Sequence, residues 1–280
     1  MDNYKDNVKG RVPISMKLKS RLLGPYGYLL LRTKALRLRL DQWMNESNGD
    51  ALPLPPPLLR FRVHGHLESD SYLQVGQTCA ENIKDLLGLI GKDLNSFSHI
   101  LDFGCGSGRV LRYFYDRPAS CHLYGTDIDR QAISWCKKHL DFASWNTNDS
   151  LPPTAYADHT FDFIFAISVF THLDEEMQFA WLNELKRISK PNGILILTVH
   201  GDTARSHTSE KEKEMVSEQG LLYTVGQTGI FKADGLPDFY QLTHHSRAYV
   251  EDRWSKVFKI LGYVEAGINA HQDAVILLHH

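Results

Sequence analysis

The 280-residue sequence predicts an α/β fold in which helices cover both faces of a mostly parallel sheet. Apolar segments of strand length alternate with helical segments from residue 99 to residue 200. These apolar segments are almost uninterrupted, as expected of strands buried on both faces. The first of them, "HILDF" at 99–103, runs into a glycine-rich loop and then a helical pattern. That succession cradles nucleotide-like ligands in doubly wound α/β folds.

The predicted elements begin with segments that precede the sheet. Residues 26–44 are apolar enough to pack and are interpreted as a helix. Residues 48–65 form a proline-rich link, which we expect not to be a regular helix because proline lacks an amide donor. A helix at 71–90 leads into the strand at 99–103.

Strands and helices are then expected to alternate. The further strands lie at 122–127, 161–167 and 193–200, with helices at 108–116, 130–140 and 174–189. A long polar insert occupies 201–245. A helix at 246–261 and two short strands at 263–268 and 274–279 close the chain.

Composition and cysteine usage predict an ordinary globular protein of the cytoplasm. Hydrophobic residues make up 42% of the chain and charged residues 23%. The four cysteines form no close pairs, which indicates reduced thiols. No apolar run is long enough to cross a bilayer, and "MDNYKDNVKG" at the start lacks the apolar core of a secretory signal.

Charge is distributed unevenly along the chain. The formal net charge of −2 gives no general argument for binding nucleic acid. Residues 1–40, however, contain ten lysines and arginines and only two acidic residues. This basic arm is a candidate for contact with an anionic surface or partner. A solvated, partly helical extension is the alternative interpretation.

The glycine loop differs from a dinucleotide-binding loop in two ways. Arg109 stands where that fingerprint has its third glycine, and Asp102 stands just before the loop. An acid at this point would repel a pyrophosphate but would suit an ammonium group. Asp127 ends the second strand, where a carboxylate can accept hydrogen bonds from two ribose hydroxyls. The ligand is therefore predicted to be a nucleoside with a cationic amino-acid tail.

At this point the sequence resembles the class I S-adenosylmethionine-dependent methyltransferases. "ILDFGCGSGRV" resembles their first motif, "YGTDID" their second, and "SKPNGILILT" the turn and strand that close the cofactor half. The resemblance implies a Rossmann-like doubly wound sheet of seven strands in the order 3-2-1-4-5-7-6, with the last strand antiparallel. "LPPPLLRFRVHG" and "GLPDFYQLTHHSRAYV" are similar to a bacterial subgroup associated with glycan and secondary-metabolite pathways.

The expected organisation follows from these observations. Residues 1–50 form a basic N-terminal helical extension, and residues 51–97 a proline-rich link and leading helix that is a candidate lid. Residues 98–280 form the class I methyltransferase domain, with the insert at 201–245. A homodimer is a candidate assembly.

The resemblance implies S-adenosylmethionine as cofactor and a set of residues around it. Asp102 and the backbone of the loop would lie along the methionine portion, and Asp127 would bind the ribose diol. Ile128 would pack on the adenine, and either Asn148 or Asp149 would reach its exchangeable edge. The candidate cofactor residues are Asp102, Gly104, Cys105, Gly106, Asp127, Ile128, Asn148, Asp149 and Ser168.

Histidines at the carboxyl edge of the sheet are the candidate catalytic residues. His172 follows the strand at 161–167 and precedes a helix, whose positive end would keep the imidazole neutral near pH 7. A histidine that only shapes the pocket is the alternative. His200, at the end of the next strand, is a second candidate base. The residues expected to line the acceptor pocket are His64, His244, His245 and Tyr249. No carboxylate cluster accompanies these histidines, so we expect no metal.

The sequence thus predicts a methyltransferase that acts on a hydroxyl of a small acceptor, a sugar or secondary metabolite, by in-line displacement. Methylation of an amine on a small molecule or protein side chain is the second hypothesis, and a cofactor-binding protein without catalysis the third. Nucleic-acid amino-methyltransferases carry an Asn/Asp-Pro-Pro-aromatic run where this chain has "AISVF". We therefore expect no nucleic-acid partner.

Overall fold

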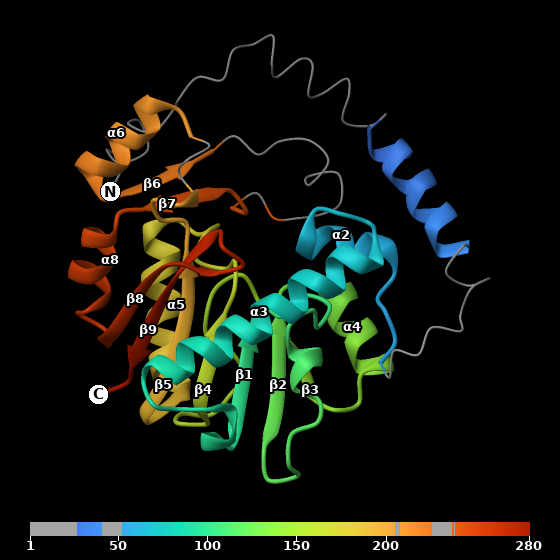
Figure 1. The fold of residues 1–280 in the computed structure, drawn as a ribbon, viewed down its shortest axis with the longest axis horizontal. Helices are drawn as coiled ribbons and strands as arrows, with labels where there is room; N and C mark the ends of the chain where they lie inside the picture. The colour runs from blue at the N-terminus through green and yellow to red at the C-terminus, as the bar shows by residue number, and fades with distance from the viewer. Residues whose placement is uncertain (1–26, 41–51, 205–207, 226–236, 238) are drawn as a thin grey trace.

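A seven-stranded sheet forms the centre of the protein in a computed structural model that describes residues 27–40, 52–204, 208–225, 237 and 239–280 (Figure 1). The strand order is β3-β2-β1-β4-β5-β9-β8. The strands are β1 (His99–Phe103), β2 (His122–Asp127), β3 (Ser144–Thr147), β4 (Phe161–Ala166), β5 (Ser189–Val199), β8 (Lys259–Ile268) and β9 (Gln272–Leu278). The first five are parallel, and β9 is antiparallel to both β5 and β8. Numbered among themselves, the seven strands have the predicted order 3-2-1-4-5-7-6, which confirms the fold.

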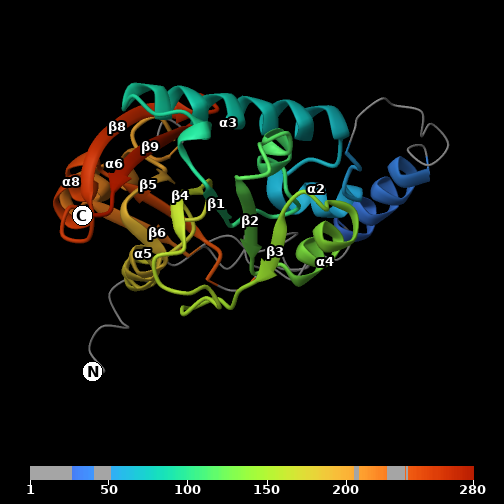
Figure 2. The same ribbon diagram turned by 90° about the horizontal axis from the view of Figure 1, so that it is seen from below.

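Helices cover both faces of the sheet, with α3 on one side and α5 on the other (Figure 2). The helices of the domain are α3 (Ser69–Leu89), α4 (Arg130–His139), α5 (Glu175–Ile188) and α8 (Arg247–Trp254). Neighbouring strand residues point to opposite faces. Ile194 and Ile196 therefore pack with α3 and α4, whereas Leu195 and Leu197 pack with α5 and α8. This explains why the strands are almost uninterrupted apolar runs.

The proline-rich link contains a helix, so the expectation of an irregular segment at 48–65 was wrong. α2 spans Pro57–His64. Its prolines lie at the N-cap and the first helical position, where the missing amide donor costs nothing because those amides have no partner within the helix. Gly65, with a φ of 76°, ends the helix in the left-handed conformation.

Two predicted helices differ from the structure. The segment predicted as a helix at 108–116 is instead a series of turns with a short 3₁₀ helix at Leu111–Phe114. Gly108 has a φ of 76°, so it cannot be part of a right-handed helix. The helix predicted at 246–261 ends at Trp254. The amides of Val257 and Phe258 both bond the Trp254 carbonyl in a turn that leads into β8.

The polar insert has structure of its own. It contains α6 (Glu210–Gln219) and a two-stranded sheet of β6 (Leu221–Thr224) and β7 (Leu242–His245). β7 is joined to the main domain through backbone hydrogen bonds, from Thr243 to Thr171 and from His245 to His200. The chain segment just before β7 therefore lies against the carboxyl ends of β4 and β5.

The N-terminal extension is described in part. Residues 27–40 are helical, in agreement with the helix predicted at 26–44, and Leu31, Ala35 and Leu38 pack on α2. The remainder of the basic arm, 1–26, and the segment 41–51 lie outside the described residues. In the described part of the chain, no helix combines the length and apolar character needed to span a membrane.

Candidate active site

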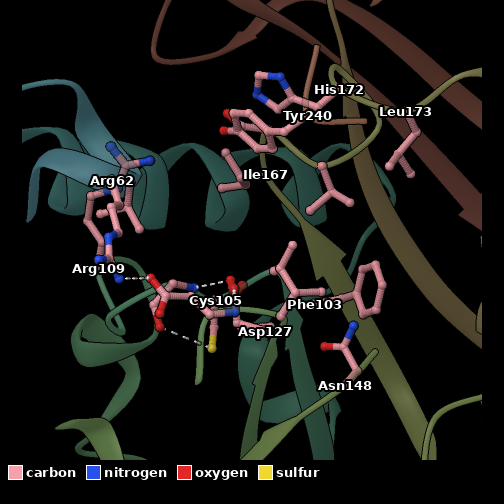
Figure 3. A pocket seen from close by; sticks show the side chains of 18 of the residues that line it. Arg62, Phe103, Cys105, Arg109, Asp127, Asn148, Ile167, His172, Leu173 and Tyr240 are labelled. Carbon is pink, nitrogen blue, oxygen red and sulfur yellow. Dashed lines mark hydrogen bonds and ion pairs between the residues drawn. The ribbon is translucent and has the colours of Figure 1, made fainter. Parts of the chain in front are cut away.

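A cavity of about 150 Å³ lies at the carboxyl ends of β1, β2 and β4, beneath α2 and the end of the insert (Figure 3). Eight of the nine predicted cofactor residues line it: Asp102, Gly104, Cys105, Gly106, Asp127, Ile128, Asn148 and Ser168. Parallel strands that end at one edge bring these scattered residues together, as expected for a doubly wound sheet.

The glycine loop presents bare backbone to this cavity. Gly104 and Gly106 have φ values of 79° and 53°, a conformation that side chains disfavour. A Cβ at Gly104 would collide with Val169, and one at Gly106 with Val63 of α2. The amides of Gly104 and Cys105 bond the Thr126 carbonyl at 2.8 and 3.0 Å, which fixes the loop against β2. The two glycines therefore let Val169 and Val63 pack directly on the loop, while the loop backbone lines the cavity.

Asp102 is a buried acid that faces the cavity. Its side chain accepts no hydrogen bond from any described residue, and the residue is only 3% exposed. Burial raises the pKa of this carboxyl well above its ordinary value, and the nearby Asp127 raises it further. An ammonium group bound beside Asp102 would offset both effects, so this position fits the cationic end of the predicted ligand.

Asp127 ends β2 with both carboxylate oxygens held by backbone amides. Gly106 donates to Oδ2 and Asp129 donates to Oδ1, each at 2.7 Å. Burial raises the pKa of this carboxyl, while the two hydrogen bonds oppose the rise. Each oxygen keeps a second lone pair, so the carboxylate can still accept hydrogen bonds from a diol in the cavity.

Of the two candidates for the adenine edge, Asn148 lines the cavity and Asp149 does not. Asn148 lines the cavity and accepts a hydrogen bond from Thr126 Oγ1 at 2.9 Å. Asp149 does not line it: its side chain is 84% exposed and lies 3.6 Å from Arg130. The candidate role of Asp149 at the adenine edge is therefore corrected, because the chain turns its side chain to solvent. Ser150 lines the cavity instead.

His172 lies where the cavity meets the insert. Its Nδ1–H donates to the Gln241 carbonyl at 2.6 Å, and its ring stacks on Tyr240 with centroids 3.9 Å apart. This hydrogen bond leaves Nε2 as the nitrogen with a free lone pair. Burial lowers the pKa of His172 to about 4, which favours the neutral ring near pH 7. The cause is burial rather than the end of α5.

Four other candidate residues lie outside both cavities described here. His200 is 7% exposed, and burial and the neighbouring histidines lower its pKa to about 3. It packs against His244 within a buried cluster. His245 donates to Gln178 Oε1 at 3.1 Å, and the Tyr249 hydroxyl donates to Glu175 at 2.7 Å. These contacts hold His245 and Tyr249 toward α5, whereas His200 and His244 pack on each other. None of the four lines either cavity, so the structure does not place His200 as a base, or His244, His245 and Tyr249 as acceptor-lining residues, where they were predicted.

A second cavity of about 490 Å³ adjoins the first. Both cavities are lined by Arg62, Val63, Arg109, His172 and Tyr240. The second cavity adds the predicted His64 and the unpredicted His66, His271 and Gln272. No carboxylate lines it among the described residues. Its walls are therefore cationic or neutral and rich in hydrogen-bonding groups.

α2 and the insert supply site residues that the sequence did not predict. Val63 covers Gly106, and Arg62 forms an ion pair with Asp129 at 2.9 Å. Tyr240 separates the two cavities, and burial raises the pKa of its hydroxyl. The segments "LPPPLLRFRVHG" and "GLPDFYQLTHHSRAYV" marked these regions in the sequence, but only tertiary packing indicates which of their residues face the cavities.

These features together occur in one class of protein. A doubly wound sheet whose last strand is reversed, with acids at the ends of its first two strands around a glycine loop, is the arrangement of class I S-adenosylmethionine-dependent methyltransferases. Residues 101–197 match the family described as "Methyltransferase domain". Over these residues the chain therefore matches a methyltransferase domain, and its sheet has the Rossmann-like methyltransferase fold.

Comparison with known proteins gives partial matches of the same kind. The chain is 29% identical over 120 residues to "Probable methyltransferase ltbC" of Aspergillus luteorubrus, which covers 39% of this chain and 41% of that protein. It is 24% identical over 161 residues to phosphoethanolamine N-methyltransferase of Plasmodium falciparum, covering 56% and 58%. It is 32% identical over 109 residues to tRNA (carboxymethyluridine(34)-5-O)-methyltransferase of Arabidopsis thaliana, covering 39% and 25%. The chain thus spans only part of each relative, at most 58%.

Solved structures share the fold. The amino pentose methyltransferase CalS10 of Micromonospora echinaspora superimposes with a TM-score of 0.54 at 14% identity, over 83% of this chain and 100% of that one. A methyltransferase from Aquifex aeolicus gives a TM-score of 0.51 at 18% identity, over 81% and 100%. At these identities the likeness extends to the fold alone.

The cofactor of this class is S-adenosylmethionine, which supplies an electrophilic methyl group on a sulfonium when bound. The residues present fit it. Asp102 offers a buried carboxylate on the cavity wall for the ammonium group, and the backbone of Gly104 and Gly106 lines the same cavity. Asp127 offers a carboxylate for the ribose, and Ile128 an apolar surface next to it.

Proposed function

We propose that the protein transfers the methyl group of S-adenosylmethionine to a hydroxyl of a small acceptor, a sugar or a secondary metabolite. The observation that carries this proposal is the position of His172. It is a neutral imidazole on the wall shared by the two cavities, with its Nδ1–H held by Gln241. Cofactor residues lie on one side of it and an open, polar cavity on the other.

His172 would accept the proton of the acceptor hydroxyl at Nε2. A base with a pKa of about 4 is unprotonated at pH 7 and therefore available. Such a weak base accepts the proton late, after bond formation to the methyl carbon has made the oxygen strongly acidic. The stacking of Tyr240 and the Gln241 carbonyl fix the ring, which lowers the entropic cost of the proton transfer.

The second cavity supports a neutral acceptor over an ammonium. Arg62, Arg109 and four histidines line it, and no carboxylate does so among the described residues. An amine that arrives protonated would meet like charge and find no anionic partner there. An amine acceptor is the second candidate, because one relative is described as a phosphoethanolamine N-methyltransferase.

We further propose that the described part of the proline-rich link and leading helix, residues 52–97, acts as a lid through α2. Val63 lies on the bare loop at Gly106, and the Tyr72 hydroxyl bonds the Ser107 carbonyl at 3.1 Å. A ligand along the loop would be covered by these contacts, which exclude water from the methyl donor. Three further points stay predictions. The acceptor is a small molecule and not a nucleic acid, the protein forms a homodimer, and it is located in the cytoplasm.

The proposal is tested by incubating the purified protein with S-adenosylmethionine and panels of sugars, phenols and amines, and measuring S-adenosylhomocysteine. Turnover of hydroxyl acceptors that depends on His172 is the expected result. Turnover of amines alone would favour the second candidate. Cofactor binding by calorimetry without turnover on any panel would indicate a cofactor-binding protein without catalysis.

A further inference from the structure

The helix at 27–40 has two apolar faces, and only one of them is used within the described structure. Leu31, Ala35 and Leu38 recur at helical spacing and pack on Phe61 and Leu67, at and just beyond α2. The helix lies at the periphery of the molecule beside α2 in both ribbon views (Figures 1 and 2). Its inner face is therefore accounted for by the fold.

The outer face carries leucines that no described residue covers. Leu29, Leu36 and Leu40 recur at intervals of seven and four residues, so they form one stripe on the side opposite Ala35. They are 59%, 60% and 51% exposed, and Leu30, on the side of the stripe that carries Arg37, is also 51% exposed. Isolated exposed leucines are ordinary, but a continuous stripe on one short helix marks an interaction surface.

Cations flank this stripe on both sides. Arg32 and Arg39 lie along one side and Arg37 along the other, and all three are exposed. No ion pair with a described carboxylate involves them, whereas Lys34, nearer α2, pairs with Glu68 at 2.6 Å. The segment 27–40 contains no acidic residue, and six further lysines and arginines precede it in the sequence. The surface is thus both apolar and strongly positive.

We infer that the outer face of helix 27–40 binds an anionic membrane surface, with the helix lying flat and the leucines entering the headgroup region. This combination of an apolar stripe with flanking arginines is what an interfacial helix needs. Nucleic acid would use the arginines but has no use for the leucines. A second copy of the chain would bring three arginines against three arginines. The inference goes beyond the proposed activity and does not depend on it.

The test uses the full-length protein and flotation with two kinds of vesicle, phosphatidylcholine alone and phosphatidylcholine containing phosphatidylserine. We expect binding to the anionic vesicles only, weakened by salt. Arg32→Gln/Arg37→Gln/Arg39→Gln should lower the partition coefficient about 100-fold, since each arginine near an anionic surface is worth roughly fivefold. Leu29→Ser/Leu36→Ser/Leu40→Ser should abolish binding.

Control variants separate this surface from general effects. Leu89→Ser and Leu151→Ser alter leucines that are 67% and 54% exposed elsewhere, and should leave vesicle binding unchanged. All variants should keep the affinity of the parent for S-adenosylhomocysteine, because none of the altered residues lines a cavity described here. That readout also tells a misfolded variant from a non-binding one.

Several outcomes would overturn the inference. One is the absence of binding to anionic vesicles by the parent protein. Another is a leucine variant that floats as well as the parent. Sedimentation velocity showing a parent dimer that the leucine variant converts to a monomer would assign the surface to a second copy. Filter binding to RNA that falls with the arginine variant, when vesicle binding does not, would assign it to nucleic acid.

Discussion

Arg62 of α2 donates a hydrogen bond to the carboxylate of Asp129 at 2.9 Å, and this ion pair joins α2 to the first turn of α4. Asp129 is also the N-cap of α4, since its side chain accepts from the amides of Gln131 and Ala132. The two paired side chains are only 14% and 16% exposed, so solvent screens the pair less than a surface pair. The Asp129 carboxylate thus caps α4 and also holds α2 in place over the glycine loop.

Breaking this pair should speed the release of S-adenosylhomocysteine about fivefold, because a partly buried pair is worth roughly 1 kcal/mol. Arg62→Gln removes the cation, and Asp129→Asn removes the anion while it keeps a good N-cap. Stopped-flow displacement measures the rate. The double variant should resemble either single variant, since both changes remove one interaction. Effects that add would show that Arg62 and Asp129 act separately.

Gly106→Ala should abolish measurable cofactor binding. The new methyl group would collide with Val63 and would also sit on a backbone with a φ of 53°. Gly106→Ala/Val63→Ala removes the collision but not the backbone strain, so it should recover part of the affinity in calorimetry. Gly88→Ala is a suitable control, since a Cβ there meets nothing within 4 Å. Equal loss in the single and double variants would contradict the contact between α2 and the loop.

Removing the carboxylate of Asp127 or of Asp102 should weaken cofactor binding, whereas removing that of Asp149 should not. Asp127→Ala removes an acceptor of two ribose hydrogen bonds and frees two backbone amides, so the dissociation constant should rise at least 100-fold. Asp102→Asn removes the charge that would face the ammonium group and should also weaken binding. Asp149→Asn, on an exposed side chain, is the matched control and should have no effect. Calorimetry of all three variants checks this order.

Much of the fold could be predicted because each central strand is marked by its own local run of apolar residues. Ile194 to Leu197 face both helical layers, so an unbroken apolar run with loops at its ends indicates a central strand. The helix at Pro57–His64 could not be predicted, since prolines at its N-cap and first position look like a break unless the start of the helix is already known. The helix predicted from Gly108 onward was wrong for the opposite reason, since the sequence does not reveal that Gly108 has a positive φ.

The cofactor side of the site was more predictable than the acceptor side. Asp102 is the last residue but one of β1 and Asp127 is the last of β2, so the sheet alone brings them to one edge. Which residues line the acceptor side depends on the face of β7 from which each side chain projects. His244 and His245 are neighbours, yet His244 packs against His200 and His245 bonds Gln178 on the other side. Tyr240 stacks on His172 only because the insert returns across the sheet edge.

Buried histidines should make the protein sensitive to acid. Burial lowers the pKa of His245 to about 3, below its value of about 6.5 in the unfolded chain. The unfolded state therefore binds more protons between these values, and the free energy of unfolding falls as pH drops from about 6.5 toward 3, by at most about 1.4 kcal/mol per pH unit per histidine. His245→Gln keeps a polar partner for Gln178 without titrating. Urea unfolding at several pH values should show a shallower acid slope for His245→Gln than for the parent, and equal slopes would contradict this prediction.

The role of His172 can be decided by rate and pH together. If it accepts a hydroxyl proton, His172→Gln should lower kcat by about 10²–10⁴ while cofactor affinity is kept, because glutamine cannot take a proton. The neutral ring is the active form and its pKa is lowered to about 4, so the parent's rate should fall only as pH approaches 4 from above.

The glutamine variant should lose this acid limb along with the rate. His200→Gln, on a ring outside both cavities, is the matched control and should keep both the rate and the limb. A pH profile of S-adenosylhomocysteine formation with a hydroxyl acceptor, compared across the three proteins, measures this. A fast glutamine variant whose defect lies in KM would instead assign His172 to the shape of the pocket, as expected for an acceptor that needs no base.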